Sequence, residues 1–236
     1  MRCINYFINY ILPHSCLTCA NYIQDEHSFC YECLKQIDFI SDSLCKICGR
    51  PFILDLSDLV SSCAKCMLNK PSFDSARALM KYDNKIAKKI IYNFKYNDKT
   101  FLAISLARLI YRNYKDWMSD CDIVIAIPMY KLKRLFRGYN QAHILAVNIA
   151  KQINRPNIVN CLIKNRWTKS QTTLSKNKRL SNLAGSFSIK NAHLIEGKNI
   201  LLVDDVVTTG STANLCSKLL KKHGAKSVKV VLIAVA

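Results

Sequence analysis

Residues 201–212 read LLVDDVVTTGST, and this stretch decides the fold. An apolar run ends in two carboxylates, Asp204 and Asp205, and a short loop of Thr, Gly and Ser follows. Apolar residues then recur at helical spacing over residues 212–223, which predicts a helix. A buried strand, a tight turn and a helix in this order are typical of an α/β protein with a mainly parallel sheet.

The loop between the strand and the helix has the composition of a phosphate site. Gly210 lets the backbone turn tightly and approach a ligand, and the free N–H groups of the next helix face the loop. Hydroxyls come from Thr208, Thr209, Ser211 and Thr212. The two carboxylates suit the vicinal hydroxyls of a ribose, or a metal bound to them. The alternative is a plain strand–turn–helix with a capping Thr or Ser and solvent-facing Asp residues.

Apolar strands and amphipathic helices alternate through the rest of the second part of the chain. Strands are predicted at residues 76–82, 122–128, 158–163, 199–203 and 227–236, and helices at residues 84–96, 100–114, 139–153 and 212–223. Residues 166–182 are polar, basic and aperiodic, so we expect a long loop there. The alternation predicts a mainly parallel sheet with helices on both faces, which binds ligands at the carboxyl ends of its strands.

Composition supports a folded chain in two parts. Half of the 236 residues are apolar, and Gly (6) and Pro (5) are few, which argues against general disorder. No apolar run reaches the ~18 residues of a membrane span, so we expect none. The change of pattern after the cysteine-rich region predicts a small module at residues 1–70, with a short helix at residues 3–12, and an α/β domain at residues 71–236.

The charge of the chain is strongly positive and unevenly distributed. The net charge is +19, yet residues 1–66 hold 5 basic and 7 acidic residues. No acidic residue occurs between Asp122 and Glu196, where thirteen Lys and Arg lie. Such a stretch would attract polyanions such as nucleic acid, nucleotides or pyrophosphate. The alternative is an AT-rich coding sequence, which also gives many Lys, Ile and Asn.

Eight of the twelve cysteines form four CxxC pairs, which predict two structural zinc sites. The pairs are Cys16 and Cys19, Cys30 and Cys33, Cys45 and Cys48, and Cys63 and Cys66. The spacing leaves open whether neighbouring pairs share an ion or whether the sites are cross-braced. Disulfides need an oxidising compartment, whereas the N-terminus has no convincing signal peptide, so we expect a cytoplasmic protein. An iron–sulfur cluster also uses four cysteines, but the paired spacing favours zinc.

The loop at residues 204–212 resembles the motif that binds phosphoribosyl pyrophosphate (PRPP) in type I phosphoribosyltransferases. Arg137 to Ala142 read RGYNQA, and a basic segment with Arg166, Gln171 and Arg179 follows. Together with the cysteine-rich N-terminal part, this order resembles the ComF family of competence-related proteins. The resemblance implies a phosphoribosyltransferase type of parallel sheet preceded by a double zinc ribbon.

The resemblance also implies roles for individual residues. Asp204 and Asp205 would be the catalytic carboxylates and contact the ribose hydroxyls of PRPP. The 5′-phosphate would be bound by Val206, Val207, Thr208, Thr209, Gly210, Ser211 and Thr212. Pyrophosphate would bind at the turn at residues 127–130. It would also contact a set of polar and basic side chains, namely Arg134, Arg137, Arg166, Gln171 and Arg179. Mg²⁺ would bridge pyrophosphate and ribose oxygens, and residues 166–182 would form a lid.

The resemblance leaves three functions open, because no segment can be assigned to an acceptor. The first is cytoplasmic handling of single-stranded DNA in transformation or recombination, with a helicase or recombination protein as partner. The second is an active phosphoribosyltransferase with an unknown acceptor. The third is a PRPP-sensing regulator without catalysis.

Overall fold

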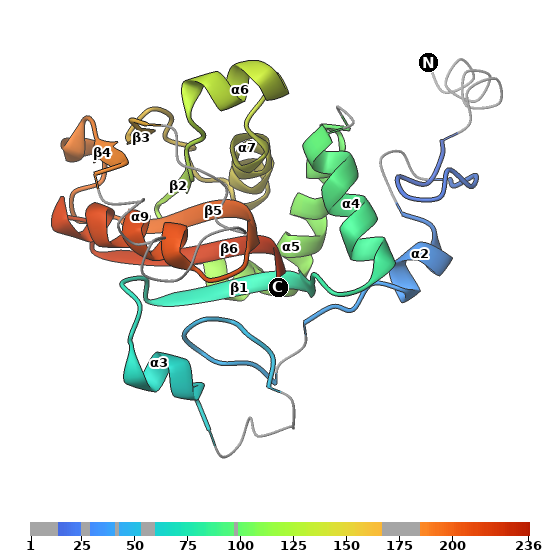
Figure 1. The fold of residues 1–236 in the computed structure, drawn as a ribbon, viewed down its shortest axis with the longest axis horizontal. Coiled ribbons are helices and arrows are strands. Elements are labelled where there is room, and N and C mark those ends of the chain that lie inside the picture. Colours follow the sequence, from blue (N-terminus) through green and yellow to red (C-terminus); the bar gives the residue numbers. More distant parts are fainter. Residues whose placement is uncertain (1–13, 25–28, 41–42, 53–59, 97–98, 167–184) are drawn as a thin grey trace.

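The computed structural model describes residues 14–24, 29–40, 43–52, 60–96, 99–166 and 185–236. Within these residues the helices are α2 (Tyr31–Lys35), α3 (Ala64–Leu68), α4 (Lys85–Tyr96), α5 (Leu102–Met118), α6 (Lys131–Arg137), α7 (Gln141–Ile153), the 3₁₀ helix η2 (Ala192–Leu194) and α9 (Ser211–Lys222). The strands are β1 (Ser75–Lys81), β2 (Ile123–Ala126), β3 (Leu162–Lys164), β4 (Phe187–Ile189), β5 (Asn199–Val207) and β6 (Ser227–Val235). Figure 1 shows their arrangement.

The centre of the fold is a parallel sheet with strand order β1-β6-β5-β2. Leu201, Leu202 and Val203 of β5 have no exposed surface, as expected of a strand covered on both faces. Because all strands run in one direction, their carboxyl ends meet at one edge of the sheet. Lys81 of β1 and Val207 of β5 both lie opposite Val235 of β6, so the three strands end in one row. The predicted α/β class with a mainly parallel sheet is confirmed.

Helices cover the two faces of this sheet. Buried side chains of α4, α5 and α7 form one core cluster, which includes Phe94, Leu106 and Ile149. Buried side chains of α9 belong to the cluster on the other face, with Cys216 and Leu220. Burying a large apolar side chain contributes about 1.5–3 kcal/mol. These layers fix the end of β5, which carries the predicted phosphate site, between α4 on one side and α9 on the other.

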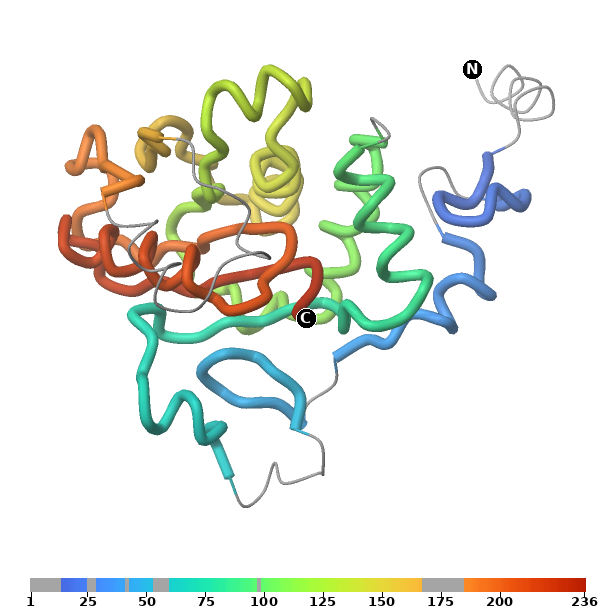
Figure 2. The backbone as a smooth tube through the Cα atoms, in the orientation of Figure 1, coloured from blue at the N-terminus to red at the C-terminus, as the bar shows by residue number. Residues whose placement is uncertain are grey.

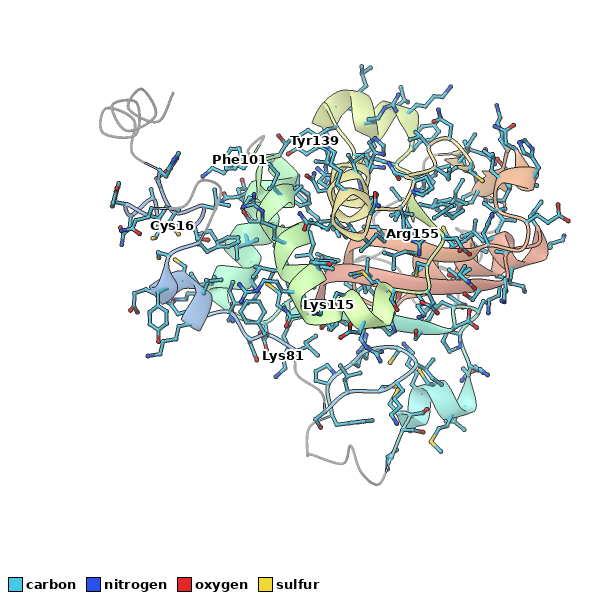
Figure 3. All side chains as sticks on the ribbon, turned by 180° about the vertical axis from the view of Figure 1, so that it is seen from behind. Cys16, Lys81, Phe101, Lys115, Tyr139 and Arg155 are labelled. Carbon is cyan, nitrogen blue, oxygen red and sulfur yellow. The ribbon has the colours of Figure 1, made fainter. Side chains whose placement is uncertain are left out.

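The cysteine-rich part packs against both faces and covers the free edge of β1. Cys16 and Cys33 belong to the core cluster of α4, and Figure 3, seen from behind, shows Cys16 on that side. The second cysteine-rich segment, residues 43–52, passes under β1 (Figure 2). Between the two, the amide of Ile40 donates to the Leu79 carbonyl at 3.1 Å, and that of Lys81 to the Asp38 carbonyl at 3.0 Å. Residues 38–40 thereby occupy an edge that would otherwise be open to another chain.

Several elements differ from the predictions. Strand β5 continues past residue 203, because Asp204, Val206 and Val207 still pair with β6. The strand predicted at residues 158–163 begins at Leu162 and pairs antiparallel with β4, forming a separate two-stranded sheet. Helix α6 was not predicted, and none of its residues is fully buried. An apolar stripe marks a helix in a sequence only where one face is buried.

Some predictions fall on residues that the structure does not describe, namely the helix at residues 3–12 and most of the loop at residues 166–182. The boundary between residues 70 and 71 stays a prediction. No helix in the described ranges is both long enough and apolar enough to cross a membrane.

Candidate phosphate site and metal centres

The predicted phosphate loop lies at the carboxyl edge of the sheet. Strand β5 ends at Val207 and α9 begins at Ser211, so three residues connect them. Gly210 is the N-cap of α9 with φ of 80°, a left-handed conformation that strains residues with a Cβ atom. An added Cβ would meet only a side-chain atom of Val207 at 3.9 Å, so glycine is needed for its conformation and not for space.

Hydroxyl groups gather within this loop. Thr209 Oγ1 and Ser211 Oγ lie 2.9 Å apart, and the Ser211 amide donates weakly to Thr209 Oγ1 at 3.4 Å. Gly210 has no side chain that could cap the helix, so the positive end of α9 faces the loop. Thr212 lies in the first turn of α9. This arrangement suits the binding of an anion.

The acid pair lies directly before the loop. The amide of Asp205 donates to Asp204 Oδ1 at 2.9 Å, and that of Val206 to Asp205 Oδ1 at 2.6 Å. Successive side chains of a strand point to opposite faces. Asp205 accordingly lies on the α4 side, where its Oδ2 is 2.9 Å from Lys95 Nζ.

Asp204 has an unusual proton affinity. Burial and the negative charge of Asp205 raise the pKa of Asp204 to about 7, against the opposing effects of the Asp205 amide and the Lys95 charge. Such a carboxyl group is only about half ionised at neutral pH. A bound cation, or a hydroxyl group that donates a hydrogen bond to it, would stabilise its ionised form. Strongly shifted carboxyl groups of this kind are concentrated at functional sites.

Three lysines that no sequence motif indicates interact electrostatically with the acid pair. Lys95 lies in the last turn of α4, Lys133 lies on α6 and Lys164 ends β3. Burial and the charge of Arg137 lower the pKa of Lys133, whereas Asp205 raises it. Burial and the charge of Lys133 likewise lower the pKa of Lys164. Only the folded topology brings these three together, since none belongs to a motif.

The RGYNQA segment connects the helices around the site. The Tyr139 hydroxyl donates to the Phe94 carbonyl at 2.9 Å, and the buried Gln141 side chain to the Lys95 carbonyl at 3.2 Å. Asn140 is the N-cap of α7, and its side chain accepts a hydrogen bond from the Ala142 amide. The segment thus fixes the end of α4, from which Lys95 reaches Asp205.

The predicted pyrophosphate residues are only partly brought together. Arg137 ends α6; it lies over the Tyr96 ring at 4.7 Å and donates to the Tyr96 hydroxyl at 2.9 Å. Arg134 is exposed on α6, and Arg166 lies two residues beyond β3. Gln171 and Arg179 lie outside the described residues.

The first four cysteines form one compact group. The sulfur atoms of Cys16, Cys19, Cys30 and Cys33 all lie within 4.8 Å of one another, and those of Cys19 and Cys30 are 3.6 Å apart. Tetrahedral zinc with Zn–S distances near 2.3 Å requires sulfur separations of about 3.8 Å. Burial opposes ionisation of Cys16, but backbone amides that donate to its sulfur outweigh it and lower its pKa to about 6.

The second four cysteines repeat this geometry. The sulfur atoms of Cys45, Cys48, Cys63 and Cys66 lie within the same limit, and those of Cys48 and Cys63 are 3.7 Å apart. Backbone amides likewise outweigh burial at Cys45 and lower its pKa to about 7. Neighbouring pairs share each site, so the cross-braced arrangement is wrong. Four thiolates fill each site and leave no open position, as in structural zinc centres.

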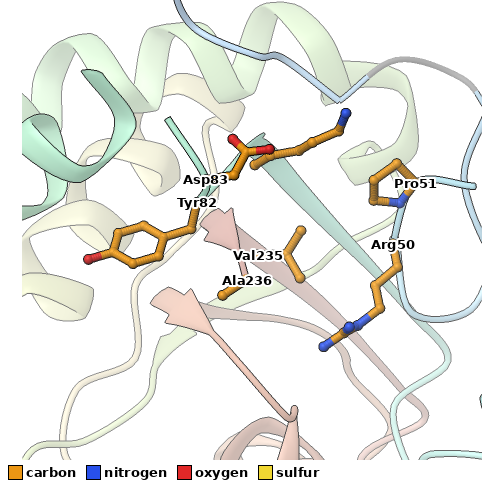
Figure 4. Close-up of a pocket in the computed structure, with 7 residues that line it drawn as sticks. Arg50, Pro51, Tyr82, Asp83, Val235 and Ala236 are labelled. Carbon is orange, nitrogen blue, oxygen red and sulfur yellow. The ribbon is translucent and has the colours of Figure 1, made fainter. Parts of the chain in front are cut away.

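A pocket with a volume of about 330 Å³ opens beside the phosphate loop (Figure 4). Its lining comes from the second cysteine-rich segment and from the ends of β1 and β6, and comprises Arg50, Pro51, Lys81, Tyr82, Asp83, Val235 and Ala236. The amide of Ala236 donates to the carbonyl of Val207, one residue before the loop. The pocket and the loop therefore share one edge of the sheet.

Comparison with known proteins accounts for both parts of the chain. Residues 7–67 match the double zinc ribbon domain, and residues 140–235 match the phosphoribosyl transferase domain. Competence protein F of Haemophilus influenzae is 30% identical over 222 residues, which cover 91% of this chain and 94% of that protein. The chain belongs to the ComF family. Its two cysteine clusters are the two zinc-binding sites of the family's ribbon.

Other ComF-type relatives are similar along most of their length. Competence protein ComFC of Bacillus subtilis is 27% identical over 216 residues, covering 87% of this chain and 83% of that protein. The DNA utilization protein YhgH of Escherichia coli K12 is 25% identical over 193 residues, covering 80% and 82%. Among solved structures, adenine phosphoribosyltransferase of Trypanosoma brucei aligns with a TM-score of 0.42 and 16% identity over 71% of this chain and 73% of that one.

Proposed function

We propose that this ComF-family chain binds PRPP and acts in the cytoplasmic handling of single-stranded DNA during transformation or recombination. The proposed PRPP binding rests on the position of the acid pair. Asp204 and Asp205 directly precede a loop that turns at Gly210 and leads into the N-terminus of α9. Such an edge has one place for a phosphate and another for vicinal hydroxyls. The lysines that face the acid pair supply positive charge for a third group, the pyrophosphate.

Mg²⁺ fits this donor set. The cation prefers oxygen ligands and keeps several waters, so one or two carboxylates together with ligand phosphates suffice. Asp204 and Asp205 would hold it, and when bound it would neutralise the pyrophosphate. The raised pKa of Asp204 is consistent with a carboxylate whose negative charge a bound cation would balance.

Calorimetric titration of the zinc-loaded protein with PRPP and Mg²⁺ tests this proposal. We expect the wild type to bind PRPP. The affinity for PRPP should fall at least about tenfold when both acids are changed (Asp204→Asn with Asp205→Asn). Asp120→Asn is the matched control, because Asp120 pairs with Lys229 of β6 away from the loop. A folded wild type that does not bind PRPP would refute the proposal.

Helix α6 supports the DNA half of the proposal. It exposes Leu135 and Phe136 (78% and 83% of their surface) among Lys131, Lys133 and Arg134. Aromatic side chains next to cationic ones are typical of surfaces that bind single-stranded DNA, because the bases stack on the rings and the phosphates interact with the positive charges. Fluorescence anisotropy with a labelled single strand should show affinity that falls steeply with salt. We expect weaker binding by Phe136→Ala, whereas unchanged binding would exclude this helix.

Transfer of the phosphoribosyl group is a second candidate function, and the pocket beside the loop favours it. Val235 and Ala236 contribute apolar side chains to its lining, while Arg50, Lys81 and Asp83 add charged groups. Its volume lies at the lower end of the range of small-molecule sites, about 300–1,000 Å³. An acceptor nitrogen would bond to the anomeric carbon as pyrophosphate leaves. Pyrophosphate release that depends on an added nucleobase would establish transfer, and PRPP binding without any release would favour the sensing role.

A further inference from the structure

Two cations of the second zinc ribbon, residues 43–66, donate to the backbone of the phosphate loop. Arg50 donates from Nη2 to the carbonyl of Thr208, and Lys65 from Nζ to that of Thr209 at 3.3 Å. Arg50 follows Cys48 by two residues, and Lys65 lies between Cys63 and Cys66. Figure 4 shows the Arg50 side chain extending from the ribbon toward the sheet end near Val235.

These contacts determine which way two peptide groups face. A trans peptide is planar, so its C=O and the N–H of the next residue point in opposite directions. With the carbonyls of Thr208 and Thr209 directed to the ribbon, the amides of Thr209 and Gly210 point away from it. Neither amide donates a hydrogen bond to any other residue in the described ranges. Two N–H donors thus point away from the ribbon, directly before the positive end of α9.

The ribbon is docked closely enough to hold these groups in place. A Cβ atom at Gly49 would come within 2.4 Å of the Ala76 carbonyl, so the ribbon backbone touches β1. The Ala76 amide donates to the Ile47 carbonyl at 2.7 Å. On the other side of the loop, the Ser72 amide donates to Asn214 of α9 at 2.5 Å. The backbone that carries Arg50 and Lys65 is therefore held in a fixed position against the sheet.

We propose that Arg50 and Lys65 are positioning residues of the phosphate site, through which the second zinc ribbon aims the amides of Thr209 and Gly210 at a phosphate group. The inference rests on the proposed binding of PRPP at this loop. The two cations also place positive charge behind the loop, which favours a dianion. Because binding effects are reciprocal, an occupied loop also stabilises the docked ribbon.

The test is calorimetric titration of the zinc-loaded chain with ribose 5-phosphate, and with PRPP and Mg²⁺. We expect Arg50→Ala and Lys65→Ala each to weaken the binding of both ligands about tenfold, with the zinc content unchanged. Arg50→Lys keeps the charge and should restore part of the affinity. Lys46→Ala is the matched control, because Lys46 is exposed between Cys45 and Cys48 of the same ribbon; it should bind like the wild type.

A measurement without ligand separates orientation from charge. Backbone NMR of the free protein should show shifted amide resonances of Thr209 and Gly210 in Arg50→Ala, but not in Lys46→Ala. Wild-type binding that Arg50→Ala and Lys65→Ala leave unchanged would overturn this inference alone. Absence of binding by the wild type would overturn the proposed function, and this inference with it.

Discussion

Lys95 Nζ and Asp205 Oδ2 lie 2.9 Å apart, although one residue lies in the last turn of α4 and the other near the end of β5. Both side chains are largely buried, so the ion pair is less screened by solvent than a surface pair. A cation of the chain itself therefore faces the acid pair. On the proposed function, PRPP with Mg²⁺ would share the carboxylates with this lysine or displace it.

Removal of Lys95 should change the titration of the acid pair. The positive charge of Lys95 lowers the pKa of Asp204, which burial and Asp205 raise to about 7. In Lys95→Met we therefore expect the pKa of Asp204 to rise further. NMR titration of the Asp carboxyl carbons measures this, with Lys229→Met as a control in a lysine that pairs with Asp120. An unchanged titration would show that Lys95 does not act on the pair.

Burial of Asp204 should make the stability of the chain fall as pH rises. The pKa of an unfolded Asp is about 3.9, and that of Asp204 in the folded chain is about 7. Between these values the folded state binds more protons than the unfolded state, so the free energy of unfolding decreases with pH. Asp204→Asn removes this contribution, and its stability relative to the wild type should increase from pH 5 to pH 8. Urea unfolding at several pH values checks this; a constant difference would contradict it.

The two zinc sites should differ in their effect on the phosphate loop. Cys19→Ser and Cys45→Ser should each lower the zinc content from two ions to one, since each removes one of four ligands. Among the cysteine-rich residues that the structure describes, only Arg50 and Lys65 of the second ribbon donate hydrogen bonds to the loop. Ribose 5-phosphate binding should therefore weaken in Cys45→Ser far more than in Cys19→Ser. Equal losses would indicate a general effect on folding.

Gly210 and Gly197 form a matched pair for testing the loop. Both have positive φ, 80° and 67°, and a Cβ would clash with nothing at either position. Alanine at either site should cost about 1 kcal/mol of stability, because it must adopt a left-handed conformation. Only Gly210→Ala should also weaken phosphate binding, measured by titration at matched temperature. If both variants bound phosphate equally, the loop would not be the site.

Most of the central sheet and the turn between β5 and α9 could be predicted from the sequence, because both depend on local patterns. Buried strands of a parallel sheet are continuous apolar runs, and a glycine before a helix marks a tight turn. The zinc pairing was left open, because spacing does not show which pairs meet. Lys95, Lys133 and Lys164 were missed for a different reason: each is one lysine among many, and only packing of α4, α6 and β3 around β5 distinguishes them.

The strand order has a consequence for how the chain reaches its native state. Strand β1 pairs with β6, with Ser75 opposite Lys229, and pairings over such a span form slowly. Each cysteine cluster closes within a short stretch, and residues 38–40 already bond to β1. During refolding, the cysteine-rich part with its metal bound would therefore cover the outer edge of β1 before β6 pairs with the other edge. Metal supplied after refolding should then recover less native protein than metal present from the start.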